Sequence, residues 1–301
     1  MYPSDTTPDS ELFTNPEMRA NDINEAFANP LIDGIISTIG GSDSARILRY
    51  LDMDIITANP KIFMGYSDTS ALTTYLNQYG LVTFNGPSVM AGFAQLHSHS
   101  AEYQRYVSMQ LLSPPVEQVL PTFSHYYHGY PDWQNTSQCG ELSEPVNNSG
   151  PVFVQGEGCA TGQLFGGCIE VLEMLKGTRY WPAPEFWHNK VLFLETSQDK
   201  PSVDYVKYWL RNYGVMGALQ QLSGLMIGRP RDYSTAEQVS LINTVQSVIK
   251  DEFNCAHLPI VCNLDFGHTD PQLLLPLGVT IKIDCEHQRL SLLESPFQAP
   301  N

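Results

Sequence analysis

The sequence has few basic residues and no dense run of them. Of its 301 residues, 16 are lysine or arginine and 32 are aspartate or glutamate, which gives a formal charge of −16 at pH 7. Because nucleic-acid binding depends on clustered lysine and arginine that neutralise phosphates, this composition argues against a nucleic-acid partner. The negative charge is otherwise a common source of solubility and identifies no partner by itself.

Long apolar segments are missing as well. No stretch reaches the ~18 apolar residues that a membrane-spanning helix requires, and the first 30 residues lack the apolar core of a signal peptide. The six cysteines are scattered and form no C-x-x-C pair, so neither a zinc knuckle nor a dense disulfide framework is indicated. We therefore expect a cytoplasmic protein with reduced thiols and no membrane contact.

Motifs of cofactor-dependent enzymes are absent too. The sequence contains no G-x-G-x-x-G, no P-loop and no H-E-x-x-H. His97 and His99 have the i, i+2 spacing of a strand within a segment that otherwise indicates helix or loop, and His125 and His128 lie in a polar segment where solvated histidines are common. A metal-dependent or dinucleotide-dependent enzyme is therefore disfavoured.

What the sequence does contain is typical of a globular protein, with 42% hydrophobic and 16% charged residues. In its first third, residues 34–38, 62–64 and 82–84 are predicted as buried strands, and residues 44–51 and 70–79 as the helices between them. This alternation is typical of a mainly parallel sheet with helices on its faces. We expect an N-terminal α/β domain of the doubly wound type.

The composition changes between residues 113 and 150, where polar residues, proline and tyrosine replace the periodic pattern. We therefore divide the chain into an N-terminal domain (1–112), a connecting segment (113–150) and a β-rich C-terminal domain (151–301). In the last domain we predict helices at residues 203–213 and 236–253, strands at 152–154, 191–194, 225–227 and 260–261, and a closing hairpin of 279–284 with 289–292.

Several aromatic residues gather in the connecting segment. They could line a ligand-binding cleft, or they could anchor an irregular loop to the core. The sequence leaves both interpretations open for Tyr126, Tyr127, Tyr130 and Trp133.

The first candidate for chemistry is Gly65-Tyr66-Ser67-Asp68, between a predicted strand and a predicted helix. A tight strand-to-helix turn can lift a serine hydroxyl clear of the sheet, as in a nucleophile elbow, and it places that serine where a helix N-terminus stabilises negative charge. On these four residues alone a structural role is favoured, because Ser67 or Asp68 could simply cap the helix.

A second candidate is Gly40-Gly41, which follows the strand at residues 34–38. Without side chains, this turn would let backbone N–H groups approach a ligand and complete an oxyanion hole with the N–H of Asp68, although it could also be a plain turn. Because the carboxyl ends of parallel strands meet at one edge of a sheet, we expect the two turns to lie close together.

Two further candidates follow strands of the C-terminal domain. His268 lies in the polar segment 263–270, and a histidine can accept the proton of a serine near neutral pH. Glu195 ends the strand at residues 191–194, where its carboxylate could orient that imidazole or be merely solvated.

The candidates, in this order along the chain, resemble the LD-carboxypeptidase family of serine peptidases, and particularly its branch of microcin C self-immunity proteins. The resemblance covers nearly the whole chain and is carried by Ser37-Thr38-Ile39-Gly40-Gly41, Gly65-Tyr66-Ser67-Asp68, Thr83-Phe84-Asn85-Gly86-Pro87, Leu164-Phe165-Gly166-Gly167, Leu194-Glu195-Thr196-Ser197, Gly228-Arg229-Pro230 and Asp265-Phe266-Gly267-His268-Thr269-Asp270.

The resemblance implies a triad of Ser67, His268 and Glu195, with the serine on a flavodoxin-like N-terminal domain and the other two residues on the C-terminal domain. It implies an oxyanion hole made of the backbone N–H groups of Asp68 and Gly41. It also implies a homodimer without metal or organic cofactor. The reaction would be hydrolysis of an amide bond through an acyl-enzyme.

The resemblance leaves two substrate classes open. Typical family members cleave murein tetrapeptides between an L-centre and a D-amino acid, whereas the immunity branch cleaves the amide that joins a peptidyl or aminoacyl group to a modified nucleotide. Residues 194–202 and 263–270 are more similar to the immunity branch. In either case Gly40 would contact the substrate, and Trp133 could stack on a nucleobase.

Two departures from the family pattern shape the expectations. Family members usually begin with a strand and a helix before the matched region, so we expect a sheet that lacks this βα unit, in a fragment or a pared-down relative. The family's Gly-Gly-Asn is Gly166-Gly167-Cys168 here. Besides an amide hydrolase, we therefore keep a second hypothesis, an inactive relative that binds peptides or nucleotides.

Overall fold

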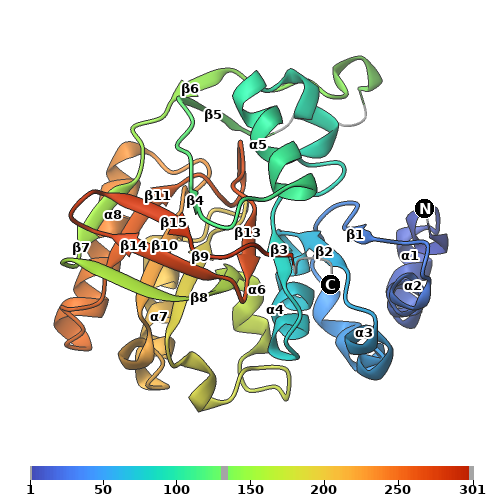
Figure 1. The fold of residues 1–301 in the computed structure, drawn as a ribbon, viewed down its shortest axis with the longest axis horizontal. Helices are drawn as coiled ribbons and strands as arrows, with labels where there is room; N and C mark the ends of the chain where they lie inside the picture. Colours follow the sequence, from blue (N-terminus) through green and yellow to red (C-terminus); the bar gives the residue numbers. More distant parts are fainter. Residues whose placement is uncertain (1, 130–134, 298–301) are drawn as a thin grey trace.

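The computed structural model describes residues 2–129 and 135–297, which form a four-stranded, an eight-stranded and a three-stranded sheet (Figure 1). No helix in these residues is both long enough and apolar enough to cross a membrane. The first two sheets lie beside each other, and the third lies at one end of both, next to α5 (Ala101–Leu112).

The four-stranded sheet has the order β1-β2-β3-β13. Its first three strands are parallel, as the alternation of strands and helices predicts, and they are β1 (Gly34–Ile36), β2 (Ile62–Gly65) and β3 (Thr83–Asn85). β13 (Leu275–Leu277) comes from the C-terminal half of the chain and pairs with β3 in the antiparallel direction. This pairing joins the two halves of the molecule.

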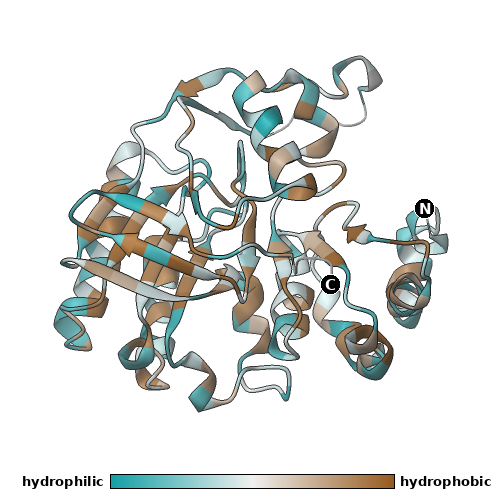
Figure 2. Ribbon diagram, viewed as in Figure 1, coloured by the Kyte–Doolittle hydropathy of each residue, from teal (hydrophilic) through white to brown (hydrophobic). Residues whose placement is uncertain are grey.

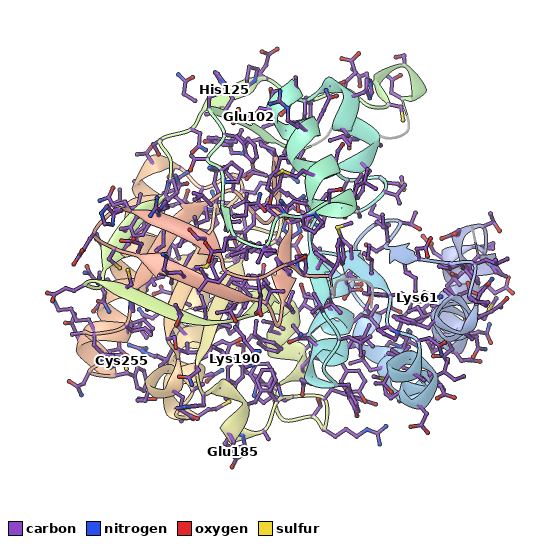
Figure 3. The ribbon with its side chains drawn as sticks, in the orientation of Figure 1. Lys61, Glu102, His125, Glu185, Lys190 and Cys255 are labelled. Carbon is purple, nitrogen blue, oxygen red and sulfur yellow. The ribbon has the colours of Figure 1, made fainter. Side chains whose placement is uncertain are left out.

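β1 is an edge strand of this sheet. A cavity of about 460 Å³ runs along it, lined by β1 and by the first two helices, α1 (Asp9–Thr14) and α2 (Glu17–Ala28). Lys61, labelled in Figure 3, donates hydrogen bonds to the carbonyl groups of Asn29 and Ile32 and so fastens the end of α2 to this sheet.

The predicted helix at residues 44–51 is wrong. The chain there forms two short 3-10 turns, η2 (Ser44–Arg46) and η3 (Leu48–Tyr50), and an α-helix begins only at α3 (Met53–Ala58). The reason is the cap: the Asp52 carboxylate accepts a hydrogen bond from the N–H of Ile55 at 3.0 Å, and an aspartate favours the start of a helix over its interior.

The eight-stranded sheet has the order β4-β15-β14-β8-β9-β10-β11-β7. β8, β9, β10 and β11 run parallel to one another, whereas β7, β14 and β15 pair in the antiparallel direction. The bounds of these strands are Gln118–Val119 (β4), Val152–Gln155 (β7), Cys159–Cys168 (β8), Lys190–Glu195 (β9), Gly224–Gly228 (β10), Ile260–Leu264 (β11), Thr280–Asp284 (β14) and Arg289–Leu292 (β15).

The central strands of this sheet carry the core. From Val191 to Leu194 every residue of β9 is at most 1% exposed, and β10 is buried along its whole length. Such continuous burial is typical of parallel strands that are covered on both faces. Figure 2 shows hydrophobic residues along these strands and hydrophilic residues on the outer turns of the covering helices α7 (Val203–Val215) and α8 (Thr235–Ser247).

The connecting segment contains regular structure. β5 (His125–His128) and β6 (Pro145–Asn147) form an antiparallel pair, and β5 also pairs with β12 (Thr269–Asp270). β12 begins directly after His268. The connecting segment therefore packs against the chain directly after His268.

Candidate active site

Ser67 lies in a turn that holds it in an unusual backbone conformation. The turn, residues 65–69, joins the end of β2 to η4 (Ser67–Thr69) and α4 (Ser70–Gln78), as the sequence predicts. Ser67 has φ of 58°, in the left-handed region that costs a residue other than glycine about 1–3 kcal/mol. A strained serine between a strand and a helix is the local geometry of a nucleophile elbow.

The structure brings Ser67, His268 and Glu195 together from two sheets. Ser67 Oγ lies 3.1 Å from His268 Nε2, and His268 Nδ1 lies 2.7 Å from Glu195 Oε2. Glu195 is the last residue of β9, and its side chain is fully buried. When the Nδ1–H group donates a hydrogen bond to the Glu195 carboxylate, Nε2 carries no proton and can accept the hydroxyl proton of Ser67.

The surroundings of His268 favour its protonated form. Burial lowers the pKa of the imidazole and the nearby Arg231 charge lowers it further, but the charge and hydrogen bond of Glu195, with a contribution from Glu170, outweigh both, so the pKa is raised above its ordinary value of 6.5. Tyr66 packs edge-on against the imidazole, with ring centroids 5.0 Å apart. The ring is thus oriented from one side by a carboxylate and from another by an aromatic side chain.

Gly267 makes room for this arrangement. Its φ is +104°, and a Cβ atom at this position would lie 2.9 Å from both Cβ and Oε2 of Glu195. Only glycine therefore fits without displacing the carboxylate that holds His268.

The Gly40-Gly41 turn approaches Ser67 as expected. A Cβ atom on Gly40 would lie 3.1 Å from both Cβ and Oγ of Ser67, so the backbone of Gly40 passes directly beside the hydroxyl. Within residues 2–129 and 135–297, the backbone N–H groups of Gly41 and Asp68 donate no hydrogen bond. Two such donors beside a serine hydroxyl can stabilise an oxyanion.

The side chain of Asp68 fastens this turn to the residues around Ser67. Asp68 is 2% exposed, and its Oδ2 accepts hydrogen bonds from the N–H of Asp43 at 3.0 Å, the N–H of Ser44 at 2.9 Å and the hydroxyl of Ser44 at 2.7 Å. Hydrogen bonds to a buried carboxylate are the stronger kind. The sequence predicts a role for the backbone N–H of Asp68, but no pattern in it marks the carboxylate for this one.

Gly166 and Gly167 bring the end of β8 close to two neighbouring elements, β9 and α4. A Cβ on Gly166 would lie 1.8 Å from the carbonyl oxygen of Phe193 on β9, and one on Gly167 would lie 2.5 Å from Ser70 Oγ on α4. Ser70 Oγ in turn accepts the N–H of Cys168 at 2.9 Å. Gly166 therefore allows β8 to lie close to β9, and Gly167 allows the helix after Ser67 to dock on the sheet that carries Glu195.

Cys168 lies opposite Glu195 in the pairing of β8 with β9. Burial raises the pKa of its thiol well above the ordinary value, and its Sγ donates to Glu170 Oε2 at 3.4 Å. The other oxygen of Glu170 accepts the N–H of Ser197 at 2.9 Å. Burial and the charge of Glu195 also raise the pKa of Glu170. Cys168 is thus a buried thiol beside the triad, and Glu170 fixes the segment after β9.

A cavity of about 710 Å³ opens over Ser67 and His268, a volume typical of ligand-binding clefts. Gly40 and Gly41 line it, as does the N-terminal helix α1, which the sequence analysis did not predict. α1 is held by Arg46, whose guanidinium lies 4.5 Å from the centre of the Phe13 ring and donates to the Phe13 carbonyl at 2.9 Å. The cavity also receives two arginines, Arg19 and Arg231.

Six of the residues singled out from the sequence thus come together. Gly40, Gly41, Ser67 and His268 line the cavity, and Asp68 and Glu195 are buried behind them. Trp133 lies outside the described residues, and so does Tyr130. The described residues hold no group of three histidine, cysteine, aspartate or glutamate side chains suited to a metal ion.

Comparisons with known proteins agree with this architecture. Residues 2–86 match the model of the LD-carboxypeptidase N-terminal domain, and residues 161–283 match that of the LD-carboxypeptidase C-terminal domain. The chain is 31% identical over 271 residues to the putative carboxypeptidase YocD of Bacillus subtilis, covering 89% of this chain and 78% of that protein. It is 28% identical to the microcin C7 self-immunity protein MccF of Escherichia coli, covering 92% and 78%.

Solved structures show the same fold. The MccF-like protein from Streptococcus pneumoniae in complex with AMP superimposes with a TM-score of 0.82 at 27% identity, over 95% of this chain and 85% of that one. Microcin C7 self immunity protein MccF in complex with aspartyl sulfamoyl adenosine gives a TM-score of 0.79 at 27% identity, over 94% and 82%.

Proposed function

Because the chain belongs to the LD-carboxypeptidase family, we propose that it is a serine hydrolase that cleaves amide bonds, with Ser67 as nucleophile, His268 as acid and base and Glu195 as the group that orients His268. The observation that carries this proposal is the pair of hydrogen bonds, 3.1 Å and 2.7 Å long, that joins the three side chains in that order. Nucleophile, base and orienting carboxylate in hydrogen-bond contact are the usual signature of an activated serine.

The first step is formation of an acyl-enzyme. His268 Nε2 takes the proton of Ser67 as Oγ attacks the amide carbonyl, and the Glu195 carboxylate stabilises the imidazolium that results. The N–H groups of Gly41 and Asp68 bind the oxyanion. His268 then gives its proton to the leaving nitrogen, and the amine departs.

Water completes the reaction. His268, neutral again, takes a proton from a water molecule that attacks the acyl carbonyl. As the ester bond to Ser67 Oγ breaks, His268 returns this proton to Oγ, which releases the carboxylic acid product and restores the free serine. Since the pKa of His268 is raised, the base is protonated and inactive in mildly acidic solution. We therefore expect activity to increase as the pH rises through a value above 6.5.

Two substrate classes fit the proposal. Relatives include a probable murein peptide carboxypeptidase from Bacillus subtilis, and solved relatives carry aspartyl sulfamoyl adenosine or glutamyl sulfamoyl guanosine. A small peptide with a terminal D-amino acid and an aminoacyl group on a nucleotide both contain an amide that Ser67 can attack. We propose that the substrate belongs to one of these classes.

The test is an assay of both classes with the purified protein. A murein tetrapeptide and aspartyl sulfamoyl adenosine are incubated with the wild type and with Ser67→Ala, and the products are separated by chromatography. We expect the wild type to release a D-amino acid from the first or aspartate from the second, and Ser67→Ala to release neither while its thermal unfolding stays unchanged.

The alternative is an inactive relative that only binds these compounds. Binding of either compound by calorimetry without any turnover would favour that alternative. Full turnover by Ser67→Ala would refute the assignment of the nucleophile.

A further inference from the structure

Two arginines line the cleft, and they differ in which of their donor nitrogens already have a hydrogen-bond partner. Arg19, on α2, donates from Nη2 to Asp43 Oδ2 at 2.8 Å, and Asp43 also pairs with Arg46 at 3.1 Å. Arg231, after β10, contacts Asp232 through Nε alone, at 3.2 Å. In the part of the chain that the structure describes, no hydrogen bond uses Nη1 or Nη2 of Arg231.

Arg231 is nevertheless held in a defined position. Its side chain is 24% exposed, and Nη2 would lie only 2.2 Å from a Cβ on Gly129, so the guanidinium rests against the backbone just after β5. Asp232 Oδ1 lies 3.3 Å from Nδ1 of His128, the last residue of β5. β5 in turn pairs with β12, with His128 opposite Thr269. Arg231 is therefore anchored through β5 to the strand that directly follows His268.

Arg229, two residues before Arg231, differs in that its guanidinium donates to partners inside the protein. Arg229 is 1% exposed, its Nη2 donates to Asp265 at 2.6 Å and to Asn148 at 2.8 Å, and its guanidinium lies 4.3 Å from the centre of the Tyr126 ring. Its donors are used inside the protein. Arg19 also lines the cleft, but its Nη2 is used by Asp43. Arg231 is the cleft arginine whose Nη1 and Nη2 both lack a partner among the described residues.

We propose that Arg231 binds an anionic group on the leaving part of the substrate, next to the scissile nitrogen. The inference rests on the proposed function. His268 delivers its proton to the leaving nitrogen, so the leaving group must lie on the imidazole side of the cleft, and Arg231 lines that cleft together with His268.

Both substrate classes carry a suitable acidic group. In a peptide with a free C-terminus the carboxylate is one carbon away from the leaving nitrogen. In an acyl sulfamoyl nucleotide the sulfonyl sulfur is bonded to that nitrogen and carries two oxygens that can accept hydrogen bonds. A guanidinium can bind either group through two parallel N–H donors. The charge of Arg231 also lowers the pKa of His268, which places the two groups within electrostatic reach of each other.

The experiment compares a murein tetrapeptide with its C-terminal amide, which lacks the negative charge. Values of kcat/KM are measured for the wild type, Arg231→Gln, Arg231→Lys and the matched control Arg19→Gln. The same pair of peptides is titrated by calorimetry into Ser67→Ala and Ser67→Ala/Arg231→Gln, and aspartyl sulfamoyl adenosine is titrated into the same two proteins.

We expect the wild type to prefer the acid over the amide by about 10- to 100-fold, the usual worth of a hydrogen-bonded charge pair. Arg231→Gln removes this preference, Arg231→Lys keeps part of it, and Arg19→Gln keeps all of it. Thermal unfolding of each variant shows whether the effect is one of folding, which would weaken turnover of acid and amide equally.

The outcomes separate this inference from the proposed function. Turnover with an acid preference that survives in Arg231→Gln overturns the inference and leaves the hydrolase intact. Absence of turnover together with an Arg231-dependent preference in binding overturns the hydrolase and leaves the inference intact. If only aspartyl sulfamoyl adenosine binds more weakly to Ser67→Ala/Arg231→Gln than to Ser67→Ala, the anion that Arg231 binds is the sulfamoyl group. If no compound loses affinity or turnover when Arg231 is replaced, Arg231 does not bind an anion and the inference is wrong.

Discussion

The two walls of the cleft are built in different ways. Ser67 lies in the turn after β2 of the four-stranded sheet, and its position depends on a strained backbone, on Gly40 and on the hydrogen bonds of Asp68. Glu195 ends β9 of the eight-stranded sheet, and His268 lies in the segment between β11 of that sheet and β12; the two residues are 1% and 5% exposed. Local geometry thus controls the first wall, and burial controls the second.

This difference separates activity from stability. On the first wall a small side chain can disturb the hydroxyl while the core remains intact. On the second wall, a change of size or charge affects packing and chemistry together, because the groups cannot relax into water. Substitutions of matched shape are therefore needed to measure chemistry on the second wall.

The largest effect is expected for Glu195→Gln. This change keeps the shape of the side chain but removes the charge that holds the Nδ1 proton of His268, and the corresponding change in other triads lowers kcat by about 10⁴-fold. We expect a loss of about 10³- to 10⁴-fold in kcat, measured on the substrate that the wild type cleaves. A loss of less than tenfold would show that Glu195 is only a buried structural carboxylate.

Gly40→Ala is expected to act on the first wall alone. Its new Cβ would lie 3.1 Å from Ser67 Oγ, so the hydroxyl must shift by a few tenths of an ångström, and we expect a loss of about 10- to 100-fold in kcat/KM. Gly34→Ala is the matched control, because its Cβ meets Ile62 Cβ at the same 3.1 Å, on the edge strand β1. Equal losses of activity in the two variants would contradict the proposed role of Gly40.

Asp68→Asn tests how the Gly40-Gly41 turn is held. The amide keeps an acceptor oxygen in place of Oδ2 but loses the charge, and its NH2 group would replace Oδ1, which is buried without a partner among the described residues. We therefore expect the free energy of unfolding to fall by about 1–3 kcal/mol. Activity should fall as well, because the Gly40-Gly41 turn is held less firmly and the N–H of Gly41 shifts away from the oxyanion. Ser44→Ala, which removes one of the three donors, should show a smaller change in both thermal unfolding and kcat/KM.

The smallest effect is expected for Glu170→Gln. The charge of Glu170 contributes to the raised pKa of His268, whereas its hydrogen bond with the N–H of Ser197 can be kept by a glutamine carbonyl. Removing the charge lowers the pKa of His268, so the acidic limb of the pH profile of kcat/KM should move to lower pH by a fraction of a unit. An unchanged limb, or one that moves to higher pH, contradicts this reasoning.

Much of this arrangement could be predicted from the sequence, because the residues lie at the ends of strongly apolar strands. β2, β9 and β10 are mostly apolar runs and β11 begins with one, and polar residues that follow such runs mark the edge of the sheet where ligands bind. The family resemblance added which serine, carboxylate and imidazole belong together. Their mutual distances came only from the structure.

The elements that were not predicted lack such a pattern. β8 contains Gly162, Gly166 and Gly167, which weaken a strand signal although close packing requires them here. α2 is rich in asparagine and aspartate, and its burial is limited to a few side chains such as Ala26 and Phe27. Arg231 follows a predicted strand and a proline, a position that could have marked it as a candidate for the cleft.

The homodimer and the domain limits near residues 112 and 150 stay predictions. Size-exclusion chromatography with light scattering addresses the first. Limited proteolysis addresses the second, since a flexible connection would be cut there before either sheet unfolds.

The central claim, that Ser67 is a nucleophile activated by His268, is tested most directly by covalent labelling with a fluorophosphonate followed by peptide mass spectrometry. We predict one adduct per chain, located on Ser67, that forms rapidly in the wild type, far more slowly in His268→Ala and not at all in Ser67→Ala. An adduct on another residue, or equal labelling rates in the wild type and His268→Ala, would contradict the account.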